Sequence, residues 1–487
     1  MSTRRALAYS LLDRYASEVL AVIAIVVLSR LLTPREIGLF AVTMIFVSLL
    51  GTLRDFGAGQ YLVQVREITT DTVRAVWTVQ LGMGVLLAVL VLLVARPATL
   101  FFGEPRVESI MQVVALTFAI TPFGSITYAW LTREMAFGKL AAMRFCGALA
   151  GTVVPILLAL QGHGAMSLAW GHVAGAAATA LASTACRPRA LPWRPGRRGL
   201  RDVVGFGTRS TLYAVLQTIR VEAPLFFLGR LHEVAAVGLF SRANGFMNIH
   251  QAFLLRAVHS VTLPLFSRIE RAGGDVGRTF VTAVTHTTAL GWAFALAAAL
   301  LADPCIRIFY GEQWLDAVPL LRVLALAGGL GMPLFLCAQV FISKGMVATN
   351  VRNGALSTVA TIACVLLAAP AGAVAVAWAS VAAMAVTVIV WSASLVRVVA
   401  LPRGELAAGL ARSAVAALGA NVAPVLVLLC YGASPPAPGL AMLLAVPGGL
   451  VGFVLTLRLT GHPLYGEIAA AMHTLAVRQP GRRGRQP

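Results

Sequence analysis

One apolar stretch, over residues 205–228, carries a helix face that could hold charge and bind a polar ligand inside a membrane. At about 100° per residue, four of its polar side chains fall within an arc of roughly 80°. They are Arg209, Tyr213, Gln217 and Arg220. A guanidinium group is permanently charged, and phenol and amide groups both donate and accept hydrogen bonds. We therefore expect this face to line water or to bind a ligand.

The next apolar stretch, over residues 234–262, repeats the arrangement with amide side chains. Its polar residues include Asn244, Asn248 and Gln251 on one face, and also Arg242 and Arg256. An Arg at the centre of a lipid-facing helix costs about 2.5–3.5 kcal/mol, so the four Arg residues of the two stretches would cost about 10 kcal/mol. They are expected to avoid lipid. For those near span ends, snorkelling to the headgroups is the alternative.

Two acidic side chains in the apolar stretches are candidates for carrying a coupling ion or proton. Glu222 lies on the face of its helix opposite Arg220, and Glu18 lies in the first apolar stretch. An ion pair is the alternative in both cases. Glu18 stands four residues after Arg14, a spacing at which helical side chains meet, and Glu222 could pair with an Arg of the neighbouring helix.

The composition indicates that these stretches belong to a polytopic membrane protein. Of the 487 residues, 59% are hydrophobic and 12% are charged, whereas a typical soluble domain is about 25% charged. A spanning helix needs about 20 apolar residues, and the chain holds about fourteen such stretches. We predict an all-α fold with spans at 15–32, 37–53, 76–95, 109–130, 145–161, 165–185, 205–228, 234–262, 279–301, 317–342, 354–369, 371–395, 413–431 and 439–457.

The distribution of basic residues predicts the orientation. The net charge is +20, which could suggest nucleic acid in a soluble chain, but cytoplasmic loops of membrane proteins also carry excess Lys and Arg. With both termini on the cytoplasmic side, 28 of the 39 Lys and Arg residues fall in the cytoplasmic segments. We therefore expect both termini to be cytoplasmic, and we expect no nucleic-acid partner.

The chain also repeats itself, which predicts two halves of six helices each. Leu228, Arg230, Leu231, Gly238, Leu239 and Phe240 repeat the residues found 200 positions earlier, and Phe309-Tyr310-Gly311-Glu312 resembles residues 101–104. Halves with six helices insert the same way up and are related by an axis along the membrane normal. The predicted parts are a first bundle (1–186), a basic linker (187–204), a second bundle (205–397), an extra helix pair (398–459) and a basic cytoplasmic tail (460–487).

Missing motifs argue against an enzyme. The sequence contains no G-x-x-x-x-G-K-[ST] loop, no H-E-x-x-H pair and no G-x-S-x-G turn. The longest predicted external loop covers about 302–316, which is too short for a catalytic domain. We expect no catalytic residues, no metal site and no cofactor. A membrane glycan polymerase or ligase would need a large external loop and is the alternative from another class.

Several motifs resemble those of the polysaccharide biosynthesis protein family, the O-antigen and exopolysaccharide flippases of the multidrug/oligosaccharidyl-lipid/polysaccharide exporter superfamily. The similar segments are Arg30-Leu31-Leu32-Thr33-Pro34, Asp55-Phe56-Gly57-Ala58-Gly59, Gly238-Leu239-Phe240-Ser241-Arg242-Ala243 and Gly311-Glu312-Gln313-Trp314-Leu315-Asp316-Ala317-Val318-Pro319-Leu320-Leu321-Arg322. One departure is that Pro224-Leu225 stands where the family often has an Asp-Asn pair.

The resemblance implies a flippase of the bacterial inner membrane that moves a polyprenyl-diphosphate-linked oligosaccharide to the periplasmic leaflet by alternating access. Its expected partners are this substrate, the phospholipid bilayer and other polysaccharide-assembly membrane proteins. Arg binds phosphate oxygens bidentately, so the four Arg residues are expected to attract the diphosphate. The Tyr and amide side chains would face the glycan. The alternatives within the superfamily are a flippase for lipid-linked peptidoglycan precursor and a multidrug exporter.

Overall fold

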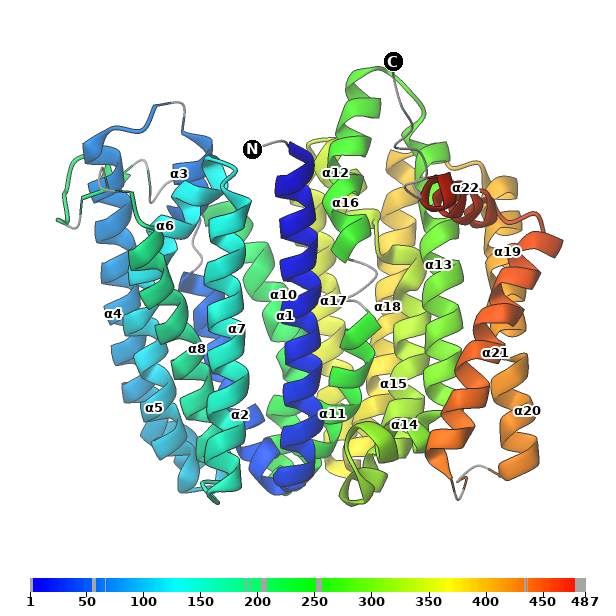
Figure 1. Ribbon diagram of the computed structural model, residues 1–487, viewed down its shortest axis with the longest axis horizontal. Helices are drawn as coiled ribbons and strands as arrows, with labels where there is room; N and C mark the ends of the chain where they lie inside the picture. Colours follow the sequence, from blue (N-terminus) through cyan, green and yellow to red (C-terminus); the bar gives the residue numbers. More distant parts are fainter. Residues whose placement is uncertain are drawn as a thin grey trace, which may run out of the picture. The chain divides into compact units, whose positions relative to one another are not determined.

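The structure is a computed structural model that describes residues 3–54, 58–65, 67–188, 191–192, 194–201, 203, 208–250, 256–432, 435 and 437–477. Every regular element in these ranges is helical, which confirms the predicted all-α class (Figure 1). The chain forms two compact units. Unit 1 comprises Met1–Phe253, Phe309–Leu320 and Val351–Ala383, and unit 2 comprises Leu254–Ile308, Leu321–Asn350 and Met384–Pro487.

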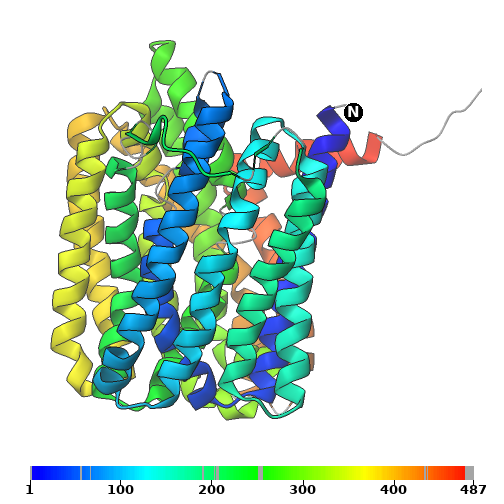
Figure 2. The same cartoon turned by 90° about the vertical axis from the view of Figure 1, so that its left-hand side faces the viewer.

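Unit 1 contains the N-terminal helices together with the helices that carry most of the candidate site. Its elements are α1 (Thr3–Leu31), α2 (Pro34–Arg54), α3 (Ala58–Gln64), α4 (Thr70–Phe102), α5 (Arg106–Ile120), α6 (Pro122–Arg133), α7 (Phe137–Leu160), α8 (Ala165–Cys186), α10 (Thr208–Leu231), α11 (Val234–His250), the 3-10 helices η2 (Glu312–Ala317) and η4 (Ala369–Ala371), and most of α17 (Val347–Ala368). α18 (Ala373–Val398) begins in unit 1 and ends in unit 2. Figure 2 shows the blue and cyan helices α4, α5 and α7 running roughly parallel.

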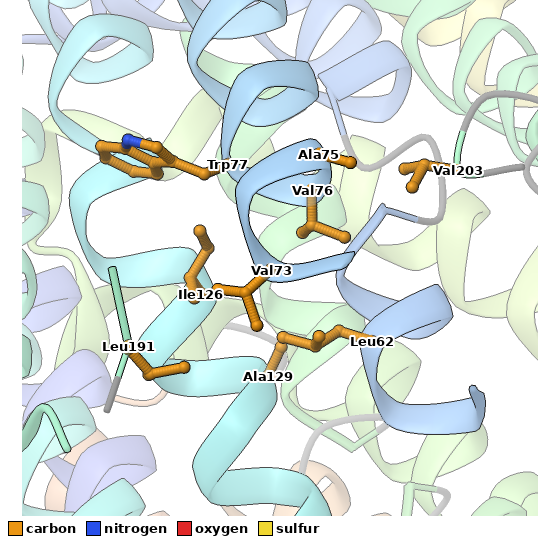
Figure 3. Packing of buried hydrophobic residues seen from close by; sticks show 9 residues of the cluster. All are labelled: Leu62, Val73, Ala75, Val76, Trp77, Ile126, Ala129, Leu191 and Val203. Atoms are coloured by element: carbon orange, nitrogen blue, oxygen red, sulfur yellow. The ribbon is translucent and has the colours of Figure 1, made fainter. Parts of the chain in front are cut away.

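The basic linker lies along α4. Leu191 and Val203 are buried in a cluster that also includes Val76 of α4 and residues of α3 and α6 (Figure 3). The Thr78 hydroxyl donates to the Gly196 carbonyl oxygen at 2.7 Å and accepts from the Gly196 amide at 2.8 Å. These bonds satisfy both backbone groups of Gly196, so the linker is attached to α4 at this point.

Unit 2 is built around α13. Its elements are α12 (Arg256–Arg271), α13 (Val276–Leu300), α14 (Ala302–Phe309), most of α15 (Val318–Gly331), η3 (Met332–Leu334), α16 (Cys337–Ser343), α19 (Arg403–Ala420), α20 (Val422–Tyr431), α21 (Pro438–Leu459) and α22 (Pro463–Val477). The Asp275 carboxylate caps the first turn of α13 by accepting from the Arg278 amide at 2.9 Å. The Ser413 hydroxyl of α19 donates to the Thr285 carbonyl oxygen of α13 at 2.9 Å.

α22 was not foreseen within the predicted tail. It packs with Leu464, Tyr465 and Ile468 on a cluster that includes Ala289 of α13 and Phe453 of α21. Figure 1 shows this helix, in dark red, lying across the ends of its neighbours in unit 2. The remaining part of the tail, residues 478–487, lies outside the described residues.

The described residues contain eleven helices long and apolar enough to cross a membrane, or twelve with the pair α5 and α6, which is bent by 44°. The membrane protein class is therefore confirmed, whereas the predicted count of fourteen and the two six-helix bundles are not. This count covers the described residues only: the side chains of the first part of α1 and residues 251–255, which follow α11, lie outside them.

Candidate functional site

Three of the predicted site residues on α10 are linked to one another by side-chain hydrogen bonds. The Gln217 amide nitrogen donates to the Tyr213 hydroxyl at 2.7 Å, and the Arg220 Nε donates to the Gln217 amide oxygen at 2.9 Å. All three side chains are half-buried. The spacing of four and three residues brings the side chains onto one helix face, as the sequence predicts. The chain of bonds fixes the direction of the Arg220 guanidinium through its Nε.

α17 packs against α10 next to these hydrogen-bonded side chains. A Cβ atom on Gly354 would lie 3.0 Å from the Tyr213 ring, so the absence of a side chain lets the ring pack against the α17 backbone. One turn further, the Thr358 hydroxyl donates to the Leu216 carbonyl oxygen at 3.1 Å. Among the described residues, no carboxylate forms a salt bridge with Arg220. Its terminal nitrogens therefore have capacity to bind an anion.

Arg242 has a different environment on α11. Its guanidinium carbon lies 5.9 Å from the Tyr310 ring centroid and 5.8 Å from the Trp314 ring centroid. The Tyr310 hydroxyl donates to the Arg242 carbonyl oxygen at 3.3 Å. The Arg242 Nε is buried without a hydrogen-bond partner in the described structure. Arg242 is thus held mainly by aromatic faces, which attract a cation by their quadrupoles.

The other predicted binding residues are placed only in part. Asn244 is half-buried and Asn248 is exposed on α11. Gln251 and the side chains of Arg209 and Arg256 lie outside the described residues. The backbone of Arg256 begins α12 in unit 2, whereas α10 and α11 belong to unit 1. The described residues of the predicted span 234–262 therefore fall in α11 and at the start of α12, and residues 251–255 lie outside the described residues.

The two acidic candidates lie on different helices of unit 1. Glu222 of α10 accepts a hydrogen bond from the Ser48 hydroxyl of α2, and one turn away the Thr52 and Thr218 hydroxyls are 2.8 Å apart. No salt bridge of Glu222 is found in the described part of the chain, so the predicted pairing with an Arg is not seen there. Glu18 lies on α1, which packs along α7. The side chain of its predicted partner, Arg14, is outside the described residues.

A polar group around the break between α5 and α6 was not predicted from the sequence. A guanidinium nitrogen of Arg54 lies 3.5 Å from the Thr121 hydroxyl at this break. The Ser125 hydroxyl of α6 donates to the Gln80 side chain of α4 at 2.5 Å. Pro122 marks the break, because proline has no backbone N–H to donate within a helix. This proline was the signal in the sequence from which the break could have been predicted.

Comparison with solved structures defines the class of fold. The lipid II flippase MurJ, in an inward closed conformation, aligns with a TM-score of 0.76 and 13% identity, covering 93% of this chain and 99% of that chain. A MATE multidrug resistance transporter in an inward-facing conformation aligns with a TM-score of 0.60 and 15% identity, covering 78% and 95%. The chain therefore shares its fold with MurJ and with this MATE transporter of the MOP superfamily.

Sequence comparison then gives the family. The family model described as polysaccharide biosynthesis protein matches residues 27–319, and the chain belongs to this family. The succinoglycan biosynthesis transport protein ExoT of Rhizobium meliloti (strain 1021) is 26% identical over 334 residues, which are 68% of this chain and 67% of that protein. The lipopolysaccharide biosynthesis protein WzxC of Escherichia coli (strain K12) is 21% identical over 313 residues, 63% of each. The predicted resemblance is confirmed.

Proposed function

We propose that this protein is a flippase for a lipid-linked oligosaccharide in the synthesis of a surface polysaccharide. Its substrate would be a polyprenyl-diphosphate-linked oligosaccharide, carried by alternating access from the cytoplasmic to the periplasmic leaflet of the bacterial inner membrane. Both termini would be cytoplasmic. Family membership, the fold shared with MurJ and the names of the relatives support this proposal, and they support a transporter rather than an enzyme.

The observation that carries the proposal is the chain of hydrogen bonds from Tyr213 through Gln217 to Arg220. A diphosphate headgroup needs a permanent cation along its path, because desolvation of one ion has an idealised cost of about 20 kcal/mol. Arg220 supplies that cation with no neutralising carboxylate in the described structure, and its neighbours supply hydroxyl and amide groups for a glycan. A cationic face of this kind suits an anionic substrate better than a cationic drug.

The remaining candidates have assigned roles within the same proposal. Arg209, Arg242 and Arg256 would attract the diphosphate together with Arg220, and Asn244, Asn248 and Gln251 would contact sugar hydroxyl groups. Glu222 would carry a coupling proton, with Glu18 as the second candidate. Assembly proteins of the same polysaccharide are the proposed partners in the membrane.

The test is to delete the gene and locate the lipid-linked sugars with a membrane-impermeant sugar-modifying reagent on spheroplasts. The deletion strain should trap single repeat units on the inner leaflet, and the wild-type gene should restore export. Arg220→Ala should lower export by at least about tenfold, because a hydrogen bond to a charged group contributes about 1.5–3 kcal/mol. The double variant Arg220→Ala with Arg242→Ala should abolish export.

Arg198→Ala is the matched control, because the Arg198 side chain is 88% exposed on the linker and should leave export unchanged. Membrane levels of every variant are measured by immunoblot. Repeat units accumulating on the outer leaflet would contradict the proposal and indicate a polymerase or ligase step. Accumulation of peptidoglycan precursor instead of repeat units would indicate the related flippase activity.

A further inference from the structure

At one end of unit 1, the backbones of α2 and α11 touch at two glycines. A Cβ atom on Gly38 would lie 1.9 Å from the Val234 carbonyl oxygen, and a Cβ atom on Gly238 would lie 2.0 Å from the Pro34 carbonyl oxygen. Both distances are far below a van der Waals contact. Only glycine fits at either position, and nothing larger than a hydrogen atom fits between the two helices there.

This contact is reciprocal under the internal repeat. Gly238 and Val234 stand 200 residues after Gly38 and Pro34, so each helix presents the same two positions to the other. Such a contact is the mark of a two-fold axis, here between two halves of one chain. The two halves of the repeat therefore meet at this crossing.

The loop next to the crossing in each half also packs on the other half. The Phe101 ring at the end of α4 stacks on Phe226 of α10 at 5.1 Å, and Arg230 of α10 lies over Phe101 at 5.1 Å. In the second half, the corresponding loop packs on the end of α1. The Trp314 Nε1 donates to the Ser29 carbonyl oxygen at 2.7 Å. Each half thus covers the first helix of the other half.

Among the described residues, the second of these loops adds hydrogen bonds to the other half. Besides the Trp314 bond, the Gln313 amide nitrogen donates to the Ser29 and Leu32 carbonyl oxygens at 2.7 and 3.1 Å. Ser29 and Trp314 are fully buried. These donors satisfy carbonyl groups that the end of a helix leaves free. They hold the end of α1 to the loop through neutral donors and acceptors.

We propose that the crossing of Gly38 and Gly238 is a gate that closes the exit side of the translocation path, and that Gln313 and Trp314 form its latch. The proposal rests on the flippase function proposed above. Because the backbones of α2 and α11 touch at this crossing, a glycan cannot pass between these two helices there, and the gate would open when they separate. Gly38 and Gly238 are positioning residues, because they let the helices close fully without touching the substrate.

The test uses a buried thiol as a reporter of gate opening in the full-length protein. The four cysteines that are not buried, Cys146, Cys186, Cys364 and Cys430, are replaced by serine. Ser29→Cys then places a near-isosteric thiol under the latch. Intact cells are treated from outside with a membrane-impermeant maleimide, and the labelling rate is measured for each variant against the background without Ser29→Cys.

Gly38→Ala and Gly238→Ala should each raise the labelling rate by about tenfold, equivalent to about 1.4 kcal/mol in the opening equilibrium. The matched controls are Gly51→Ala on α2 and Gly245→Ala on α11, because a Cβ atom at either position meets no atom within 4 Å. Trp314→Phe, which removes the Nε1 donor and keeps a ring, should also raise the rate. Equal rates in Gly38→Ala and Gly51→Ala would overturn the gate, as would labelling from the cytoplasmic side alone.

A second measurement needs no cysteine replacement. Amide hydrogen exchange over residues 35–42 in the purified native-sequence protein should be faster in Gly38→Ala than in Gly51→Ala, and equal exchange would count against the gate. These measurements distinguish failure of the proposed function from failure of the gate. If the wild-type gene does not restore export but the labelling differs as expected, the gate stands and the substrate assignment fails.

Discussion

Arg220 and Arg242 are the same residue type on neighbouring helices, yet their surroundings give them different properties. Arg220 is aimed by a neutral amide, the Gln217 side chain, and has no carboxylate partner in the described structure. The Arg242 guanidinium lies next to the Tyr310 and Trp314 rings. The first arrangement leaves the terminal guanidinium nitrogens available for an anion, whereas the second also ties the side chain to the loop that covers α1.

At the same scale, Glu222 yields a test of proton coupling. Glu222→Gln removes the ionisable carboxyl and keeps an oxygen that can accept from the Ser48 hydroxyl. If Glu222 carries the coupling proton, flipping in proteoliposomes should lose its acceleration by an imposed pH gradient, so that rates with and without the gradient become equal. Glu67→Gln, at an exposed loop position, is the control. A variant that keeps the full acceleration would remove Glu222 from the mechanism.

Among the elements, α22 depends on a histidine that is both a helix cap and a cross-link. The His462 Nδ1 accepts from the Leu464 amide at 3.1 Å, which caps the first turn, and its Nε2 lies 3.2 Å from the Ser413 hydroxyl of α19. An accepting Nδ1 requires the neutral ring. Burial, with smaller contributions from His286 of α13 and Arg412 of α19, lowers the pKa of His462 from 6.5 to about 4.

This pKa shift predicts that α22 undocks as the pH falls. The folded His462 resists protonation, so the undocked state binds the proton first below pH 6.5. Docking is therefore fully stable above that pH and weakens as the pH falls towards about 4. Amide exchange over residues 464–470, corrected for intrinsic rates, should rise between pH 7 and 5.

Asn can serve as the same cap without titrating, so His462→Asn should remove this pH dependence. His163→Asn, at an exposed turn, is the control and should behave as the wild type. Exchange in α22 that rises equally in His462→Asn would contradict the assignment of the pH dependence to His462.

The linker along α4 makes a prediction about stability. Thr78→Val removes both hydrogen bonds to Gly196 and should lower the free energy of unfolding by about 1–2 kcal/mol. Thr99→Val is the matched control on the same helix, because within the described residues the Thr99 hydroxyl bonds the Ala95 carbonyl oxygen one turn earlier and no linker residue. The measurement is thermal unfolding of the detergent-solubilised protein. Equal losses in the two variants would show that the linker adds nothing.

At the scale of the whole molecule, the internal repeat acquires a physical meaning. In sequence it is a handful of matches at an offset of 200. In unit 1 it becomes a reciprocal contact, because α2 and α11 meet through Gly38 and Gly238. The compact units do not follow the order of the chain, since α10 and α11 group with the N-terminal helices. The proximity of α10 and α11 to the N-terminal helices is therefore known only from the structure.

The sequence alone was sufficient for the class of protein, the family and the face shared by Tyr213, Gln217 and Arg220, because hydropathy, motifs and helical periodicity are local properties. It was insufficient for the bond from Trp314 to Ser29, the contact between α2 and α11, and the docking of α22. Each of these joins segments that are distant along the chain or depends on how closely two helices approach. A glycine in a sequence is only a weak helix former; whether it is also a point of closest approach is decided by tertiary packing, which determines what a side chain there would strike.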